Sequence, residues 1–194
     1  MIRDIEEEIS KMKQVVQKTV SQARYAHSLR TARTAEELCI RYELDGRVGY
    51  YCGVVHDMCK EMTDRQLTSL CHYDTDPVTD IEKARKNLLH GRAAAVRLQR
   101  DYGIDNQDIL EAVKYHTFGK PGICDLAKIL YISDKMEPGR QTVPVDFWKT
   151  HENDTLNDLV IWVLEDNIRY MHEIGNELSP WTEEFLFDLV KKDR

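Results

Sequence analysis

Apolar side chains recur every three or four residues along most of the chain. The first series comprises Ile5, Ile9, Met12, Val16, Val20, Ala23 and His27. Side chains at this spacing fall on one face of an α-helix, whereas the strict alternation that is typical of β-strands is absent from the sequence. The pattern therefore predicts an all-α protein, a bundle whose helices pack through their apolar faces.

Turn and capping residues divide this pattern into separate helices. We expect helical segments over residues 5–42 (one helix or two), 48–59, 82–102, 126–136 and 156–171, with further helices starting at Thr63, after Asn106 and at Ser179-Pro180. Thr63 to Gln66 have the Thr-x-x-Gln form of a capping box, and Gly103 is a typical helix end. The helix that starts after Asn106 ends near Gly119, and residues 74–80 are typical of a loop.

The chain carries no sign of a division into domains. No internal repeat, low-complexity tract or Gly/Ser-rich linker interrupts its 194 residues. A chain of this length buries roughly 70 % of the surface that its unfolded form exposes, which is enough for a core without covalent staples. We therefore expect a single domain over residues 1–194. The apolar tail helices suit either the core of a monomer or the interface of a homodimer.

Charge and hydropathy restrict the partners. Lys and Arg number 27 against 34 Asp and Glu, a formal net charge of −7, which argues against nucleic-acid binding. No apolar run approaches the roughly 20 residues that cross a bilayer. The acidic residues 1–8 lack the basic start and apolar stretch of a secretory signal. We expect a cytoplasmic protein with no membrane partner.

The cysteines do not form a recognisable metal or disulfide pattern. They are Cys39, Cys52, Cys59, Cys71 and Cys124, an odd number with no Cys-x-x-Cys pair. Neither a disulfide framework nor a thiolate zinc site is indicated. We expect most of them to be small core residues.

Histidines and aspartates, in contrast, fall on or beside the apolar faces of several predicted helices. These residues are His27, His56, Asp57, His90, His116 and Asp134. Burying an ionisable side chain costs several kcal/mol unless it is paired or bound to a metal, so a metal centre would account for all six. Imidazole and carboxylate ligands without thiolate suit iron, manganese or zinc. A lone helical histidine is more often an ordinary core or surface residue, so this spacing alone leaves the question open.

The order of these residues resembles a known pattern. His27, then His56-Asp57, then Asp134 resembles the H…HD…D signature of the HD superfamily of metal-dependent phosphohydrolases. Five segments further resemble the bacterial YqeK family: 24–29 (RYAHSL), 56–61 (HDMCKE), 88–91 (LLHG), 115–119 (YHTFG) and 131–140 (YISDKMEPGR). The resemblance runs from about residue 10 to residue 190. It implies a single-domain HD-type helical bundle.

The resemblance also implies a ligand set. His27, His56, Asp57 and Asp134 would hold a first metal ion, and His90 and His116 a second, with Asp57 shared. The family suggests iron, as one or two ions, although these ligand types do not exclude manganese or zinc.

The activity that the resemblance implies is symmetrical hydrolysis of diadenosine tetraphosphate to two ADP, by a metal-bound water at a dinuclear site. Catalytic roles would fall to Asp57, Lys60, His90 and His116. The ligand would be a dinucleoside polyphosphate or a nucleoside diphosphate. Side chains expected to bind it are Arg24, Lys60, Thr117, Gly119 and Arg140, with Lys120 as a further candidate.

Three alternatives stay open at this point. The protein could be an HD-superfamily phosphohydrolase that acts on another nucleotide, since a fold does not decide the substrate. It could be a non-catalytic nucleotide sensor that uses the metals to hold its ligand. It could also be a helical interaction scaffold in which the histidines have no metal to bind.

Overall fold

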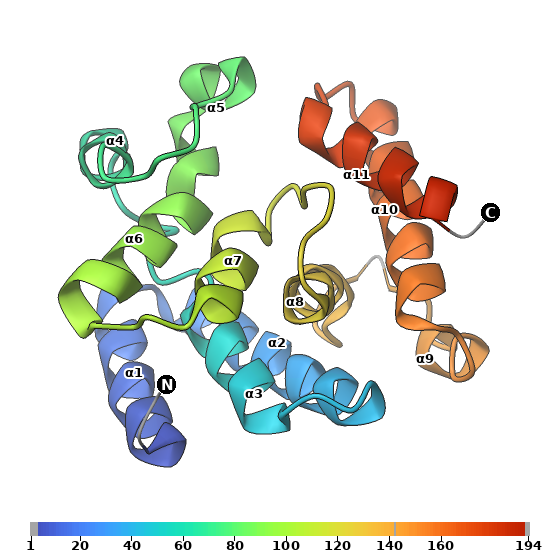
Figure 1. Ribbon diagram of the computed structural model, residues 1–194, viewed down its shortest axis with the longest axis horizontal. Helices are drawn as coiled ribbons and strands as arrows, with labels where there is room; N and C mark the ends of the chain where they lie inside the picture. Colours follow the sequence, from blue (N-terminus) through green and yellow to red (C-terminus); the bar gives the residue numbers. More distant parts are fainter. Residues whose placement is uncertain (1–3, 142, 193–194) are drawn as a thin grey trace.

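The structure is a computed structural model that describes residues 4–141 and 143–192, and within these ranges it contains helices and no strand (Figure 1). The elements, in chain order, are α1 (Ile5–Thr19), α2 (Gln22–Arg41), α3 (Gly46–Val55), α4 (Asp64–Cys71), α5 (Asp80–Ala84), the 3₁₀ helix η1 (Lys86–Leu89), α6 (His90–Tyr102), α7 (Gln107–Tyr115), α8 (Asp125–Met136), α9 (Phe147–Thr150), α10 (Leu156–Glu173) and α11 (Pro180–Lys192). The predicted all-α class is confirmed.

The long first segment consists of two helices. The backbone is extended at Val20 and Ser21, and the Ser21 hydroxyl accepts a hydrogen bond from the backbone N–H of Arg24, which caps α2. The capping box at Thr63 and the left-handed Gly103 are present as predicted.

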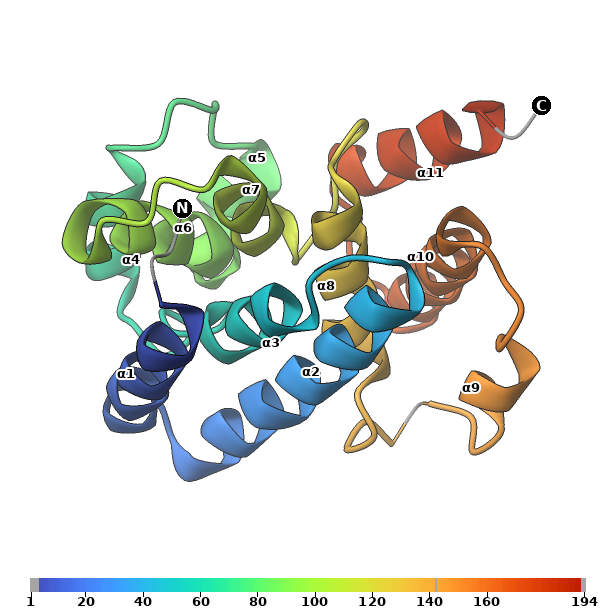
Figure 2. The ribbon, with the colours of Figure 1, turned by 60° about the horizontal axis from the view of Figure 1, so that its bottom comes forward.

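Helices α2 and α3 lie side by side with their backbones in close approach (Figure 2). A Cβ atom on Gly53 would lie 2.3 Å from Cα of Ala32, and one on Gly49 would lie 2.5 Å from Sγ of Cys39. Only glycine fits such a contact. The close approach brings the end of α3, where His56 and Asp57 follow, toward His27 in the second turn of α2.

The predicted helix over 82–102 is wrong as a single element. The chain leaves the helical conformation at Arg85, with φ −126° and ψ 83°, so that α5 and η1 precede α6. A buried network accounts for the break: Arg92 of α6 is 2 % exposed and donates hydrogen bonds to Glu82 and Asp74. The bend places His90 at the first position of α6 instead of inside a longer helix.

The predicted helices over 48–59 and 107–119 also end early, α3 at Val55 and α7 at Tyr115. In both cases the next residue is a histidine whose Nδ1 lies 2.7 Å from a backbone carbonyl three residues earlier, Gly53 O for His56 and Val113 O for His116. Each imidazole therefore satisfies a carbonyl of the last helical turn, which a helix end leaves without a partner.

Helix α8 lies between the α2, α3 and α7 helices on one side and α10 on the other (Figure 1). Buried residues from both ends of the chain belong to one hydrophobic cluster, among them Val16, Leu130, Val163 and Phe185. The tail helices thus complete this core, and the homodimer stays a prediction. The short α9 was not predicted. No helix of the described residues is long and apolar enough to span a bilayer.

The five cysteines are free thiols. Four of them are buried, and Cys124 is partly buried. Their expected use as small core residues is confirmed for those four.

Candidate metal centre

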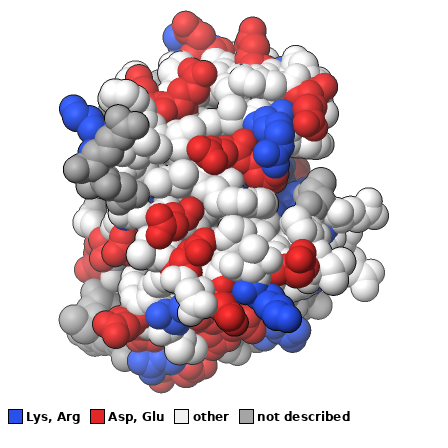
Figure 3. Space-filling model, turned by 90° about the vertical axis from the view of Figure 1, so that its right-hand side faces the viewer, with Lys and Arg blue, Asp and Glu red and all other residues white. Residues whose placement is uncertain are grey.

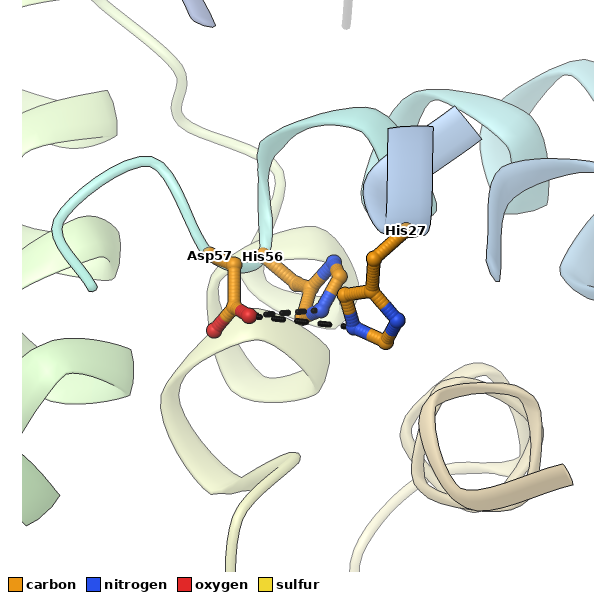
Figure 4. A group of neighbouring side chains, drawn as sticks. All are labelled: His27, His56 and Asp57. Atoms are coloured by element: carbon orange, nitrogen blue, oxygen red, sulfur yellow. Dashed lines mark ion pairs between the residues drawn. The ribbon is translucent and has the colours of Figure 1, made fainter. Parts of the chain in front are cut away.

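The six predicted ligands come from five separate stretches of the chain and meet at one point. His27 lies on α2, His56 and Asp57 follow α3, His90 begins α6, His116 follows α7 and Asp134 lies on α8. Five of the six are buried, and Asp134, whose side chain is 14 % exposed, is partly buried. His27, His56 and Asp57 converge in Figure 4.

The two oxygens of Asp57 face two different pairs of histidines. Oδ2 lies 3.7 Å from Nε2 of His27 and 3.5 Å from Nε2 of His56. Oδ1 lies 3.2 Å from Nε2 of His90 and 3.6 Å from Nε2 of His116. Two groups of ligand atoms, each compact enough for one metal ion, therefore share this carboxylate.

Asp134 completes the first of these groups. Its Oδ1 lies 3.1 Å from Nε2 of His27 and 3.7 Å from Nε2 of His56. The first group thus offers two imidazole nitrogens and two carboxylates, and the second offers two imidazole nitrogens and the other oxygen of Asp57.

Hydrogen bonds at Nδ1 set the tautomer of the histidines. In His56, His90 and His116 the Nδ1 atom lies 2.7 Å from a backbone carbonyl, which can only accept. Nδ1 must therefore carry the proton, and Nε2 presents its lone pair to the centre. This is the arrangement of metal-binding histidines, in which a partner at one ring nitrogen orients the other.

Several buried ligand atoms have no hydrogen-bond partner within the protein. His27 Nε2, His56 Nε2 and Asp57 Oδ1 make no hydrogen bond. The Nε2 atoms of His90 and His116 lie only 3.1 Å apart, although both are acceptors in the tautomer that their Nδ1 contacts set. Buried unsatisfied acceptors are costly, so the arrangement requires cations between them. The residues fit a divalent metal with nitrogen and oxygen ligands.

The ligands differ in the protonation state that their surroundings favour. Burial alone would raise the pKa of the Asp57 carboxyl, but His56, His116 and His90 hold that pKa well below its ordinary value. Burial lowers the pKa of His116 to about 4, so this imidazole is neutral. Burial alone would also lower the pKa of His56, but Asp57 and Asp134 raise it to about 9, so a metal ion bound there would displace a proton from this imidazole.

Glu137 lies beside the ligand His27 and was not predicted from the sequence as a site residue. It is 1 % exposed, its Oε1 lies 3.1 Å from Nδ1 of His27, and its carboxylate accepts hydrogen bonds from Arg30 and from the backbone of Gly139. Such a carboxylate orients a metal-binding histidine and raises its basicity. The only indication in the sequence was that Glu137 belongs to segment 131–140, which resembles the YqeK family. The periodicity of the helices does not predict a contact between Glu137 and His27.

Four cationic side chains surround the centre, and one of them is Lys135, whose Nζ lies 3.7 Å from Asp134 Oδ2. Arg24 Nη1 lies 2.9 Å from Asp57 Oδ2, Lys60 Nζ lies 3.2 Å from His90 Nε2, and Arg140 Nη2 lies 2.8 Å from Asp134 Oδ1. Arg140 contacts the ligand that is its neighbour in the sequence, whereas Arg24 and Lys60 each contact a ligand from another stretch of the chain.

The centre opens into a cavity of about 800 Å³, which we call the large cavity. His90, His116, Asp134, Lys60, Thr117 and Arg140 line the end at the centre. The opposite wall belongs to α10 and the start of α11 and includes Asn167 and Tyr170. The apolar pattern of α10 predicted a monomer core or a homodimer interface, so this wall was not predicted from the sequence.

Two predicted substrate contacts lie elsewhere. Gly119 has φ +70°, and a Cβ there would lie 2.3 Å from the Phe185 ring, so turn geometry and packing account for this glycine. Lys120 donates to the hydroxyl of Tyr115 and lies 3.6 Å from Asp76. Neither lines the large cavity, and their contact with substrate stays a prediction.

Comparisons with known proteins agree with this geometry. Residues 24–139 match the HD domain family. A symmetrical bis(5'-nucleosyl)-tetraphosphatase of Staphylococcus aureus is 33 % identical over 139 residues, 71 % of each chain, and one of Bacillus subtilis is 26 % identical over 86 % of this chain and 89 % of its own. The crystal structure of a predicted HD superfamily hydrolase involved in NAD metabolism from Clostridium acetobutylicum superposes with a TM-score of 0.86, at 29 % identity, over 94 % of this chain and 97 % of its own.

The Asp57→Asn variant tests the shared carboxylate. Because Asp57 belongs to both ligand groups, we expect this variant to lose nearly all bound metal, whereas His27→Gln should lose only the ion of the first group. Elemental analysis of the purified proteins measures this, with exposed His72→Gln as the matched control. Full metal content in a folded Asp57→Asn protein would refute a shared ligand.

The Glu137→Gln variant tests the support of His27. Loss of such a partner typically weakens metal binding about 10- to 100-fold, and we expect a decrease of that size in chelator competition. Glu37→Gln, an exposed change on the same helix as His27, should leave the affinity unchanged. Equal affinities in both variants would mean that Glu137 only stabilises the fold.

Proposed function

The chain belongs to the HD domain family, and from this membership we propose that it is a hydrolase that cleaves diadenosine tetraphosphate symmetrically into two ADP. Relatives named symmetrical bis(5'-nucleosyl)-tetraphosphatases support this substrate. The observation that carries the proposal is the position of Asp57 between two pairs of buried histidines, at the end of a cavity large enough for a nucleotide.

The residues fit one or two divalent ions, and we propose iron as the resident metal, with manganese and zinc as the alternatives that the ligands would accept. A divalent ion at such a site supplies Lewis-acid chemistry: it lowers the pKa of water and neutralises phosphate charge. His27, His56, Asp57 and Asp134 would hold the first ion, and Asp57, His90 and His116 the second.

The cationic side chains near the metal centre would offset the negative charge of the substrate. A tetraphosphate is strongly anionic, the chain has a net charge of −7, and acidic side chains predominate on the face of the C-terminal helices in Figure 3. Lys60 and Arg140, which line the large cavity, and Arg24 concentrate positive charge where phosphates would bind. Arginine suits this role because its guanidinium can contact two oxygens at once.

The proposed reaction breaks the central bridge of the substrate. The oxygen of a water molecule bonds to one of the two phosphorus atoms beside the central bridging oxygen, and the bond from that phosphorus to the bridge breaks. The bridging oxygen leaves with the other half of the molecule, and a proton is released. Both halves are then ADP.

The test is product analysis with metal-loaded protein. We expect diadenosine tetraphosphate to give ADP as the sole nucleotide product by chromatography, because cleavage at the central bridge yields two identical halves. ATP together with AMP would contradict symmetrical cleavage. Binding without turnover would favour a nucleotide sensor, and neither binding nor turnover would favour another substrate.

The Lys60→Ala variant separates phosphate binding from metal binding. A hydrogen bond to a charged group contributes about 1.5–3 kcal/mol, so we expect kcat/KM to fall roughly 10- to 100-fold. The metal content should be retained, because Lys60 is not a ligand. Lys83→Ala removes an exposed lysine that does not line the large cavity and should keep full activity. An unchanged kcat/KM in Lys60→Ala would show that the phosphates of the substrate do not contact Lys60.

A further inference from the structure

We infer that the protein holds only one of the two nucleosides of its substrate, and that adenosine 5'-tetraphosphate, which lacks the second nucleoside, is therefore a further substrate. This inference rests on the proposed function. It follows from a comparison of the two pockets that meet at the metal centre.

The metal centre is accessible from two sides. One side is the large cavity, which reaches His90, His116 and Asp134. The other is a smaller depression of about 280 Å³ that reaches His27, which we call the small groove. Gly139 and Arg140 line both pockets, so they mark the boundary between them. A substrate cleaved at its centre would extend one half to each side.

The large cavity has the size and walls of a nucleoside site. Its volume lies within the range of about 300–1,000 Å³ that is usual for small-molecule pockets. Apolar and aromatic side chains form part of its wall, namely Leu88, Phe118, Val163, Tyr170 and Met171. Asp166 and Asn167 stand among them and offer hydrogen-bonding groups for a base or a ribose.

The small groove lacks these features. Its volume is below that usual range. Among the described residues that line it, Ala23 is the only one with an apolar side chain, none is Phe, Tyr or Trp, and the imidazole of His27 is engaged with Asp57 and Asp134 of the metal centre. A base needs a flat apolar or aromatic surface for stacking, so this groove offers the second base no such site.

The groove instead suits phosphate. Arg24, Arg30 and Arg140 line it. Its two acidic side chains are already engaged, Glu137 with His27 and Arg30, and Glu61 with the backbone and hydroxyl of Ser21. The distal phosphates of the substrate can therefore lie along the groove, while the second nucleoside extends beyond it into solvent.

The reaction with adenosine 5'-tetraphosphate follows the same course. A water oxygen bonds to one of the two phosphorus atoms that flank the central bridging oxygen of the chain. The bond from that phosphorus to the bridge breaks, and a proton is released. The products are ADP and inorganic pyrophosphate, and no co-reactant other than water is required.

The first test compares the two substrates with the metal-loaded protein. Loss of a stacked base typically costs roughly 10- to 100-fold, so we expect kcat/KM for adenosine 5'-tetraphosphate to lie within about tenfold of that for diadenosine tetraphosphate. A larger loss would overturn the inference and leave the proposed function intact. Turnover of neither substrate would instead refute the proposed function.

The second test counts nucleoside sites without turnover. Calorimetric titration of the metal-loaded protein with ADP should give one site per chain, and two equivalent sites would overturn the inference. Tyr170→Ala should weaken ADP binding and lower kcat/KM for both substrates by the same factor. Phe187→Ala, a change at an exposed aromatic residue outside both pockets, is the matched control. Unchanged ADP binding in Tyr170→Ala would show that the nucleoside does not bind in the large cavity, and this result would overturn the inference.

Discussion

The Asp57 carboxylate is the constraint on which the rest of the site depends. It is buried, and its two oxygens lie against two separate pairs of imidazoles. A lone carboxylate could not remain ionised at such a depth, because transferring an ion out of water costs several kcal/mol. The surrounding histidines and Arg24, whose Nη1 lies 2.9 Å from Oδ2, compensate this cost. The helices that bear these histidines must therefore meet at one point, and this requirement determines how they pack.

Helix ends and close backbone contacts create this meeting point. His56 and His116 directly follow helices, and His90 begins one. In each of these imidazoles, Nδ1 lies 2.7 Å from a backbone carbonyl and Nε2 faces the other predicted metal ligands. The same side chains thus contribute to the local backbone structure and to the ligand geometry. The contact of Gly53 with Ala32 serves the same end, since any side chain there would move α3, and with it His56, away from α2.

Much of the site could be predicted because helical periodicity and short sequence motifs identify its residues. His27 continues an apolar helical face, and the order of His56, Asp57 and Asp134 matches a family pattern. The break at Arg85 could not be predicted, because the buried contacts of Arg92 with Glu82 and Asp74 override a continuous helical pattern. The link between Glu137 and His27 was equally inaccessible, since it joins residues 110 positions apart. The large cavity depends on how α10 packs against α8, which no single segment encodes.

The wall of the large cavity on α10 and α11 lies outside residues 24–139, the stretch that matches the HD domain family. The ligands of the metal centre all lie inside that stretch. If the proposed function holds, part of the nucleoside wall therefore lies in a different stretch of the chain from the proposed metal ligands. Evolution can exchange residues such as Asn167 and Tyr170 without disturbing a single metal ligand. In this architecture a lineage can diverge toward new nucleotides while it inherits its hydrolytic machinery unchanged.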